Sequence, residues 1–109
     1  MPRIVNDFKI GATFILYGKL EDSNSVFDSS GYSIACQIND SAGNKIDTLT
    51  AEFITPTPEG YNFLISKLAS YTKLWPPGAA VYDIKITAPN GIVDYTVTEN
   101  INLIVNVTP

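Results

Sequence analysis

The sequence has 109 residues, which is the size of a single domain, 1–109, with its own hydrophobic core. Hydrophobic residues make up 45% of it, so an intrinsically disordered chain is excluded. The 7 basic and 11 acidic residues give a net charge of −4, which argues against binding nucleic acid through its phosphates. Charged residues reach only 17%, against about 25% in an average domain, and this shortage predicts a surface that is partly hidden against partners.

Several kinds of site are excluded by the residues that the sequence lacks. It contains no histidine, the commonest group in acid–base catalysis and in zinc sites. Its single cysteine, Cys36, can form no disulfide within the chain. The N-terminal arm, residues 1–7, has no signal-peptide core, and no apolar run is long enough for a membrane helix. We therefore expect no cofactor, no metal and no membrane association.

β-Strands dominate the predicted secondary structure, because Ile, Val and Thr outnumber Leu and favour strands. Apolar and polar residues alternate with the period of two that is typical of a strand with one buried face. The alternating segments are 14–20, 32–39, 49–53, 61–65, 80–87, 92–98 and 101–108. The residues predicted to face the core include Phe14, Leu16, Tyr32, Ile34, Cys36, Ile38, Leu49, Ala51, Phe53, Tyr61, Phe63, Ile65, Ala80, Tyr82, Ile84, Ile86, Ile101, Leu103, Val105 and Val107. Short strands at this spacing are typical of a sandwich or a small barrel.

Turn-forming residues separate these strands. Residues 40–44 predict a hairpin loop, and residues 56–60 predict a turn that begins at proline and ends at glycine. Asn90-Gly91 predicts a type I′ hairpin turn, in which both central residues have a positive φ. Residues 66–74 do not alternate; they predict one short helical turn, ended by Pro76-Pro77-Gly78, that crosses from one sheet to the other.

The order of these motifs follows that of a known group of proteins. The motifs are Gly11-Ala12-Thr13-Phe14, Ser30-Gly31-Tyr32-Ser33-Ile34, Gln37-Ile38-Asn39-Asp40, Gly60-Tyr61-Asn62-Phe63, Pro76-Pro77-Gly78, Val81-Tyr82-Asp83-Ile84, Asn90-Gly91 and Val105-Asn106-Val107-Thr108. In this order they resemble the small immunoglobulin-like β-sandwich proteins of tailed bacteriophages and prophages. The resemblance covers nearly the whole chain.

This resemblance implies an all-β protein, an immunoglobulin-like antiparallel β-sandwich of about seven or eight strands. It also implies a non-enzymatic structural protein of a phage or prophage virion, in the tail or the baseplate, that is made in the host cytoplasm. Its partners would be other virion proteins and further copies of itself, in a trimer or a hexamer. Symmetric closure is the usual route to such an oligomer.

Apolar residues on strand faces opposite the core are candidates for an interface. Ile15 and Tyr17 lie opposite the face that holds Phe14, and Ile104 is placed in the same way in the last strand. Large apolar and aromatic side chains on an outer face need a cover, and aromatic residues are enriched in protein interfaces. We expect a neighbouring subunit or the N-terminal arm to cover them.

Tyr71 and Trp75 support an alternative function, because aromatic side chains are enriched in binding hot spots. Exposed beside the Pro76-Pro77-Gly78 turn, they would form the contact surface of a carbohydrate- or receptor-binding module. The default expectation for Trp75 is nevertheless that it fixes the crossover segment onto the core. Burial of its side chain would count against the alternative function.

Three further features resemble parts of metal-binding or catalytic sites, but each is incomplete. The spacing of Asp22, Asn24 and Asp28 resembles part of a calcium loop, but the glycine and the distal glutamate are missing, so a solvated loop is expected. Asp83 has no partner for acid–base catalysis, and we expect it to have a structural role. Cys36 alternates with apolar residues and has no histidine to activate it, so we expect a buried thiol and no enzyme.

Overall fold

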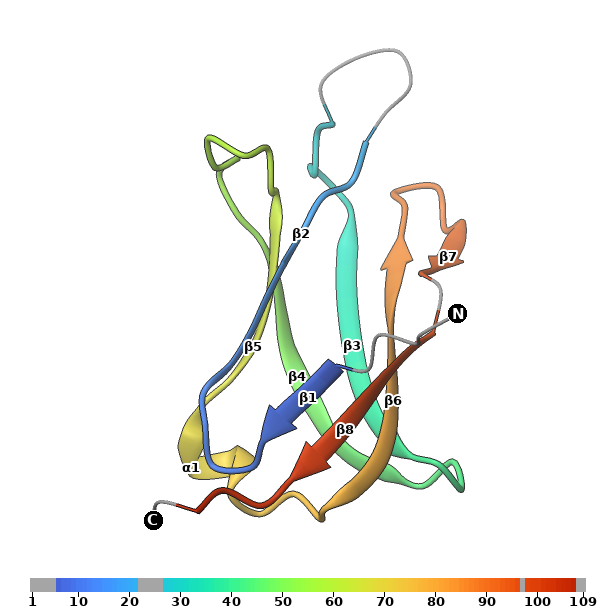
Figure 1. The fold of residues 1–109 in the computed structure, drawn as a ribbon. Helices are drawn as coiled ribbons and strands as arrows, with labels where there is room; N and C mark the ends of the chain where they lie inside the picture. The colour runs from blue at the N-terminus through green and yellow to red at the C-terminus, as the bar shows by residue number, and fades with distance from the viewer. Residues whose placement is uncertain (1–5, 22–26, 97, 108–109) are drawn as a thin grey trace, which may run out of the picture.

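The computed structural model describes residues 6–21, 27–96 and 98–107, and its regular secondary structure is almost entirely β (Figure 1). The elements are β1 (Asn6–Lys9), β2 (Phe14–Gly18), β3 (Ser33–Asp40), β4 (Lys45–Phe53), β5 (Phe63–Lys67), α1 (Ala69–Thr72), β6 (Gly78–Thr87), β7 (Val93–Tyr95) and β8 (Glu99–Ile104). The prediction of an all-β protein is confirmed. Within the described ranges no helix has the length or the apolar character to cross a membrane.

Hydrogen bonds link the strands into one continuous sheet, which folds back on itself. Its order is β1-β8-β6-β3-β4-β5-β2, and β7 also pairs with β6. Neighbouring strands are antiparallel, except that β1 runs parallel to β8. β4 changes partner along its length, because residues 45–49 pair with β3 and residues 50–53 pair with β5.

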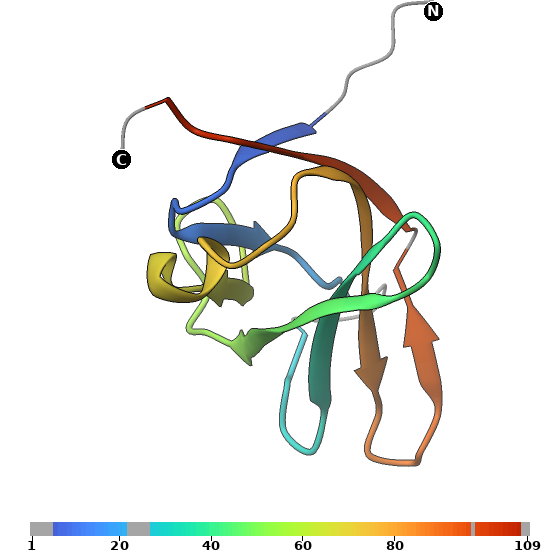
Figure 2. The same ribbon diagram turned by 90° about the horizontal axis from the view of Figure 1, so that it is seen from below.

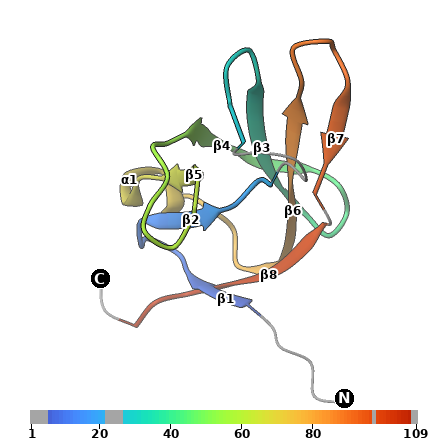
Figure 3. The same cartoon turned by 90° about the horizontal axis from the view of Figure 1, so that it is seen from above.

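The change of partner in β4 creates two layers that face each other (Figures 2 and 3). Layer A, as we name it, holds β1, β8, β6, β7, β3 and the first half of β4. Layer B holds the second half of β4, β5 and β2. The buried apolar residues lie between the layers and are Phe14, Cys36, Ile38, Leu49, Phe63, Ile65, Trp75, Ala80, Tyr82, Ile84, Ile101 and Leu103. Phe14 of layer B meets Tyr82 of layer A with ring centroids 6.2 Å apart, so aromatic packing joins the two layers.

The segment between β5 and β6 crosses from layer B to layer A, as the sequence predicts. The helical turn is shorter than the predicted 66–74, because Ser66 and Lys67 extend β5 and pair with β2. Thr72 is fully buried where α1 ends, and its hydroxyl donates a hydrogen bond to the Ala12 carbonyl at 2.6 Å. The same hydroxyl accepts one from the Gly11 amide at 3.2 Å, so the crossover is fastened to the start of β2.

Both predicted hairpins are present, since β3 pairs with β4 and β6 with β7 in antiparallel ladders, but the turn type predicted for the second hairpin is not. At the β3–β4 turn the Asp40 carboxylate accepts hydrogen bonds from the amides of Ala42 and Asn44 at 3.0 and 2.9 Å, which confirms the hairpin. At the β6–β7 turn Gly91 has a positive φ of 88° but Asn90 does not, because every positive φ in the described part of the chain belongs to a glycine. The prediction of a type I′ turn there is therefore wrong, because that turn requires a positive φ at both central residues.

Other predictions fail where a strand begins or ends. Tyr61 precedes β5, and its side chain is exposed, not buried. β8 ends at Ile104, so Val105 and Val107 lie beyond the ladder and are 69% and 92% exposed. Residues 6–7 of the predicted arm belong to β1, which pairs with β8. Residues 1–5 lie outside the described residues, so cover of Tyr17 by the arm stays a prediction. The predicted acidic loop lies partly outside the described residues.

Candidate functional site

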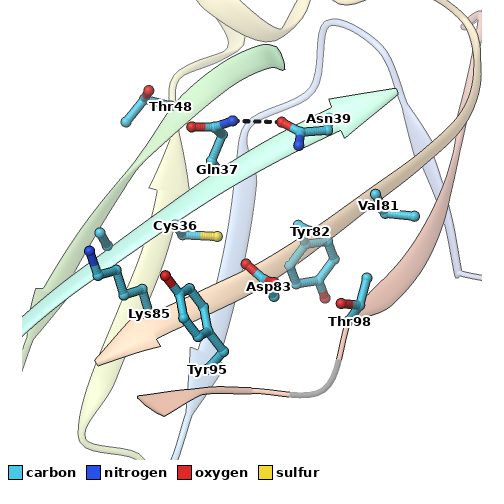
Figure 4. Close-up of a pocket in the computed structure, with 11 residues that line it drawn as sticks. Cys36, Gln37, Asn39, Thr48, Val81, Tyr82, Asp83, Lys85, Tyr95 and Thr98 are labelled. Atoms are coloured by element: carbon cyan, nitrogen blue, oxygen red, sulfur yellow. Dashed lines mark hydrogen bonds between the residues drawn. The ribbon is translucent and has the colours of Figure 1, made fainter. Parts of the chain in front are cut away.

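A hollow of about 500 Å³ opens on the outer face of layer A (Figure 4). We name it the layer A hollow. Its lining residues are Ala35, Cys36, Gln37, Asn39, Thr48, Val81, Tyr82, Asp83, Lys85, Tyr95 and Thr98. They come from β3, β4, β6, β7 and the residue that precedes β8. The volume falls in the range of sites that hold small ligands, roughly 300–1,000 Å³.

The hollow lies where the strand beside β6 is interrupted. β8 pairs with residues 78–82 of β6, and β7 pairs with residues 85–87. Asp83 therefore lies opposite the segment that joins β7 to β8. Thr96 holds that segment in place, since its hydroxyl accepts a hydrogen bond from the Ile84 amide and its own amide donates to the Ile84 carbonyl, both at 2.9 Å. Tyr95, the residue before Thr96, pairs with Lys85 in the β6–β7 ladder and lies at the rim.

Strand register brings the polar side chains of the hollow together. Gln37 pairs with Asp83 across β3 and β6, while Lys85 pairs with Tyr95 across β6 and β7. Small or short apolar side chains, Ala35 and Val81, occupy neighbouring positions of the same face. Because they fill less space than their neighbours, they leave room between the longer polar side chains.

Hydrogen-bonding groups in the hollow are only partly used. The Gln37 side-chain amide donates to the Asn39 side-chain oxygen at 2.7 Å, as the dashed line in Figure 4 shows. This bond leaves the Gln37 oxygen and the Asn39 amino group available to a ligand. Asp83 and Lys85 take part in no ion pair among the described residues. The hollow therefore offers hydrogen-bond donors and acceptors together with one charge of each sign.

Cys36 lies beneath the hollow on the inner side of β3 and is 3% exposed. Burial, together with the negative charge of Asp83, raises the pKa of the Cys36 thiol to about 12. The thiol is therefore protonated at neutral pH, whereas nucleophilic attack and metal binding need the thiolate. The predicted buried location of Cys36 is confirmed.

The donor set does not fit a transition-metal site. Zinc and copper are held mainly by imidazole and by cysteine or methionine sulfur. The sequence has no histidine, one cysteine and one methionine. In the part of the chain that the structure describes, no three His, Cys, Asp or Glu side chains come together as metal ligands.

Of the predicted interface residues, Ile15 and Tyr17 lie on the outer face of layer B, 58% and 47% exposed. The ring of Tyr17 is 6.0 Å from that of Tyr61, centroid to centroid. Tyr71 is 53% exposed on α1, and the Lys67 ammonium lies 4.8 Å from the centre of its ring. Ile104 is half-buried at the end of β8. These residues are divided among β2, α1 and β8, and they do not line one cavity.

Trp75 is not a surface residue, which corrects its inclusion among the interface candidates. Its side chain is 4% exposed and packs against the rings of Phe8 and Phe14, with centroids 5.5 and 6.0 Å away. Its indole N–H donates to Asp47 Oδ2 at 3.0 Å, so the one polar atom of the ring has a partner in the interior. Tyr71 and Trp75 thus form no common aromatic platform, and the binding site predicted beside this turn is wrong.

Asp47 belongs to a polar cluster that supports the core. Its carboxylate lies 3.3 Å from the Lys67 ammonium and also accepts the Trp75 hydrogen bond. Burial alone would raise the pKa of Asp47, but the hydrogen bonds from Trp75, Lys67 and the Thr48 amide outweigh it and lower the pKa. The cluster fixes the crossover segment to β4, which is a structural role.

Sequence reasoning did not assemble the layer A hollow. It placed Gln37 and Asn39 on the solvated side of one strand, and Asp83 and Lys85 on that of another. Alternation gives the face of each residue, but it does not give the register that pairs Gln37 with Asp83. The one available signal was Tyr95, an aromatic residue close to a hairpin turn.

No family model matches the sequence, and no curated protein matches it. Among solved structures, the chain is similar to CopC from Methylosinus trichosporium OB3b, with 12% sequence identity and a TM-score of 0.53. The likeness covers 99% of this chain and 91% of that one, and at this identity it concerns the fold.

This comparison corrects the functional prediction. The similar structure is a CopC protein and not a virion protein, and this finding overturns the prediction of a phage structural protein of the tail or baseplate. The turn and strand motifs that carried the resemblance are the ones that any protein with short antiparallel strands needs. They indicate an all-β architecture, which CopC shares, and they do not distinguish one function from another.

Proposed function

We propose that this protein is a non-enzymatic binding module and that the layer A hollow is its recognition surface. The observation that carries the proposal is the interruption between β7 and β8, beside which a space opens over Asp83. Functional residues commonly lie where irregular segments are held by a rigid scaffold. Here the scaffold is the β3–β6 ladder, and Thr96 fixes the irregular segment to it.

The strand order supports an immunoglobulin-like architecture for this module. In immunoglobulin domains one sheet has strands in the order G, F, C, and the facing sheet contains E beside B. β8, β6 and β3 follow the first order in layer A, and β5 and β2 follow the second in layer B. The helical turn α1 lies between β5 and β6, where the chain passes from one layer to the other. The strand shared by both layers, β4, departs from this pattern.

The chemistry of the hollow favours binding over catalysis. Acid–base catalysis needs at least two groups with separated pKa values, such as a pair of carboxylates or a histidine with a partner. Asp83 is the one carboxylate among the lining residues, and the chain has no histidine. Cys36 is held in its protonated form below the surface. The other polar side chains of the lining can donate or accept hydrogen bonds to a ligand.

The proposal is tested by binding the protein to arrays of immobilised glycans and peptides. Two double variants are compared with the wild type. One, Asp83→Ala with Tyr95→Ala, alters the hollow, and the other, Ile15→Ser with Tyr17→Ser, alters the outer face of layer B as a matched control. We expect bound array members to be lost with the first variant and kept with the second. Binding that is lost only with the control variant, or no binding in either array, would refute the proposal.

A further inference from the structure

The size of the layer A hollow limits the kinds of ligand that it can bind. A stable protein–protein interface buries about 800 Å² on each partner and is broad and closely packed. The hollow is instead a local depression of about 500 Å³ around one interruption in a sheet. That volume accommodates a small molecule or one short stretch of a chain-like ligand. A folded protein partner would leave most of this space unfilled.

The charges of the lining residues limit the class of ligand further. Asp83 and Lys85 lie two residues apart on β6 and on the same face, so one negative and one positive group balance locally. A polyanion such as nucleic acid needs several cationic side chains, and Lys85 is the one cation among the lining residues. The chain as a whole carries a charge of −4, which also disfavours anions. The charge balance therefore suits a neutral ligand.

The polar groups suit a ligand that carries hydroxyls. Each hydroxyl donates one hydrogen bond and accepts others, so it pairs equally well with the Gln37 oxygen, the Asn39 amino group and the Asp83 carboxylate. Gln37 and Asn39 hold each other in position through their 2.7 Å hydrogen bond, which reduces the entropy lost when a ligand binds. Thr48 and Thr98 add two more hydroxyls at the walls.

Tyr95 supplies the apolar part of the site. Its ring is 62% exposed at the rim, and Figure 4 shows it standing beside Asp83 and Lys85. An exposed tyrosine ring combines a flat apolar face with a polar tip. A sugar ring presents the matching surface, since its C–H groups form an apolar face and its hydroxyls project around the edge.

We infer that the layer A hollow binds a neutral saccharide, with Tyr95 against the face of a sugar ring and Asp83, Gln37 and Asn39 on its hydroxyls. This inference rests on the proposed function and names the ligand class of the same site. It differs from the earlier prediction of a carbohydrate site beside Trp75, because none of the residues of that turn lines the hollow.

The test is a titration of the ¹⁵N-labelled protein, followed through its amide NMR signals. The probes are glucose, galactose, mannose, N-acetylglucosamine and the disaccharides cellobiose and lactose. We expect at least one of them to shift the amide signals of residues 35–39, 83–85 and 95, and to leave those of residues 15–17 unchanged. Alanylalanine, a zwitterion, and inorganic phosphate are titrated in the same way as the competing ligand chemistries.

Substitutions of tyrosine distinguish a loss of sugar stacking on Tyr95 from a loss of binding caused by a disturbed fold. Tyr95→Ala is expected to raise the dissociation constant of the bound sugar about tenfold or more, and Tyr95→Phe to change it by less than about twofold. Tyr61→Ala removes an exposed tyrosine from layer B and serves as the control, with no effect expected. An equal loss with Tyr95→Ala and Tyr61→Ala would contradict the inference.

The outcomes distinguish this inference from the proposed function. If the dipeptide or phosphate shifts signals at the hollow and no sugar does, the saccharide inference is overturned. The proposed function as a binding module then still stands. Shifts with a sugar at residues 15–17 instead of the hollow would overturn both. No shift with any probe, combined with binding to array peptides that depends on Asp83 and Tyr95 and with binding to no array glycan, would overturn the saccharide inference alone.

Discussion

The outer faces of the two layers are built from the same alternation but have opposite character. On layer A the outward positions of β3 and β6 carry Gln37, Asp83 and Lys85, and the interrupted neighbouring strand leaves a hollow above them. On layer B the outward positions of β2 carry Ile15 and Tyr17, in an unbroken edge strand without a charged residue. The first face suits a discrete polar ligand, and the second suits contact over an area. The two outer faces therefore differ in two respects, in the polarity of their side chains and in whether a neighbouring strand is interrupted.

Both faces depend on one core, and the largest expected effect comes from removing its tryptophan. Trp75→Ala takes away a ring that packs on Phe8 and Phe14 and leaves the Asp47 carboxylate without its indole donor. We expect the free energy of unfolding in a denaturant titration to fall by about 3–5 kcal/mol. Tyr71→Ala, at an exposed position of the same crossover, is expected to cost less than about 1 kcal/mol. Equal costs for the two variants would mean that Trp75 is not in the core.

Layer B is expected to be sensitive at Gly18, the last residue of β2. A Cβ atom there would overlap the ring of Phe63, its cross-strand partner, which is 5% exposed. Gly18→Ala is therefore expected to lower the free energy of unfolding by about 1–3 kcal/mol through overpacking. In Phe63→Leu the same alanine should cost less, because the ring is absent. Additive effects of the two substitutions in a double-mutant cycle would contradict this contact.

Acid should weaken the polar cluster that supports the crossover. The pKa of Asp47 is lowered in the folded protein, so its contribution is complete above the unfolded-state pKa, about 4, and is lost as the pH falls through the folded-state pKa. We expect the free energy of unfolding to decline from about pH 4 downward. Asp47→Asn should flatten that decline while leaving an oxygen to accept the Trp75 hydrogen bond. The same slope in both proteins would exclude Asp47 as a source of acid sensitivity.

The reactivity of Cys36, which lies beneath the layer A hollow, tests whether the hollow reaches the core. Because burial raises the pKa of its thiol to about 12, we expect labelling by a thiol reagent at pH 8 to be on the order of 100-fold slower in the native than in the denatured protein. Addition of a bound sugar should leave this slow rate unchanged. Rapid labelling of the native protein would show that the hollow opens into the core.

The smallest effect on stability is expected on the outer face of layer B. Ile15→Ser with Tyr17→Ser changes two exposed side chains and should alter the free energy of unfolding by less than about 1 kcal/mol. The predicted homo-oligomer is tested on the same variant by light scattering over a wide concentration range. We expect the wild type to have a higher mass than the variant. If the wild type is a monomer at every concentration, the prediction that this face mediates self-association is wrong.

The sequence predicts the strands and most of the core because alternation is a local property. Ile34, Cys36 and Ile38 are placed on the inner face of β3 correctly, and Ile84 is placed correctly on β6. The same rule fails at Val105, because alternation continues past the point where β8 loses its partner. Where a strand ends is decided by the neighbouring strand, which a single segment of sequence does not contain.

The candidate site was much less predictable than the core. The location of Trp75 depends on Asp47, a hydrogen-bond partner 28 residues earlier in the chain. The hollow depends on the register of three strands and on the interruption that Thr96 holds in place. Sequence gives the chemical groups of Asp83, Lys85 and Tyr95, but only the paired sheet shows that they surround one space.

The shared strand β4 has a consequence for the order in which the protein folds. β3, β4 and β5 follow one another in sequence and in the sheet, so their ladders close short loops at a low cost in chain entropy. β1 and β8 come from opposite ends of the chain, and the hydrogen bond between Asp7 and Asn102 joins residues 95 positions apart. We expect the central meander to form first and the terminal pair last. The hollow, which is bounded by the start of β8, would then be completed only at the end of folding.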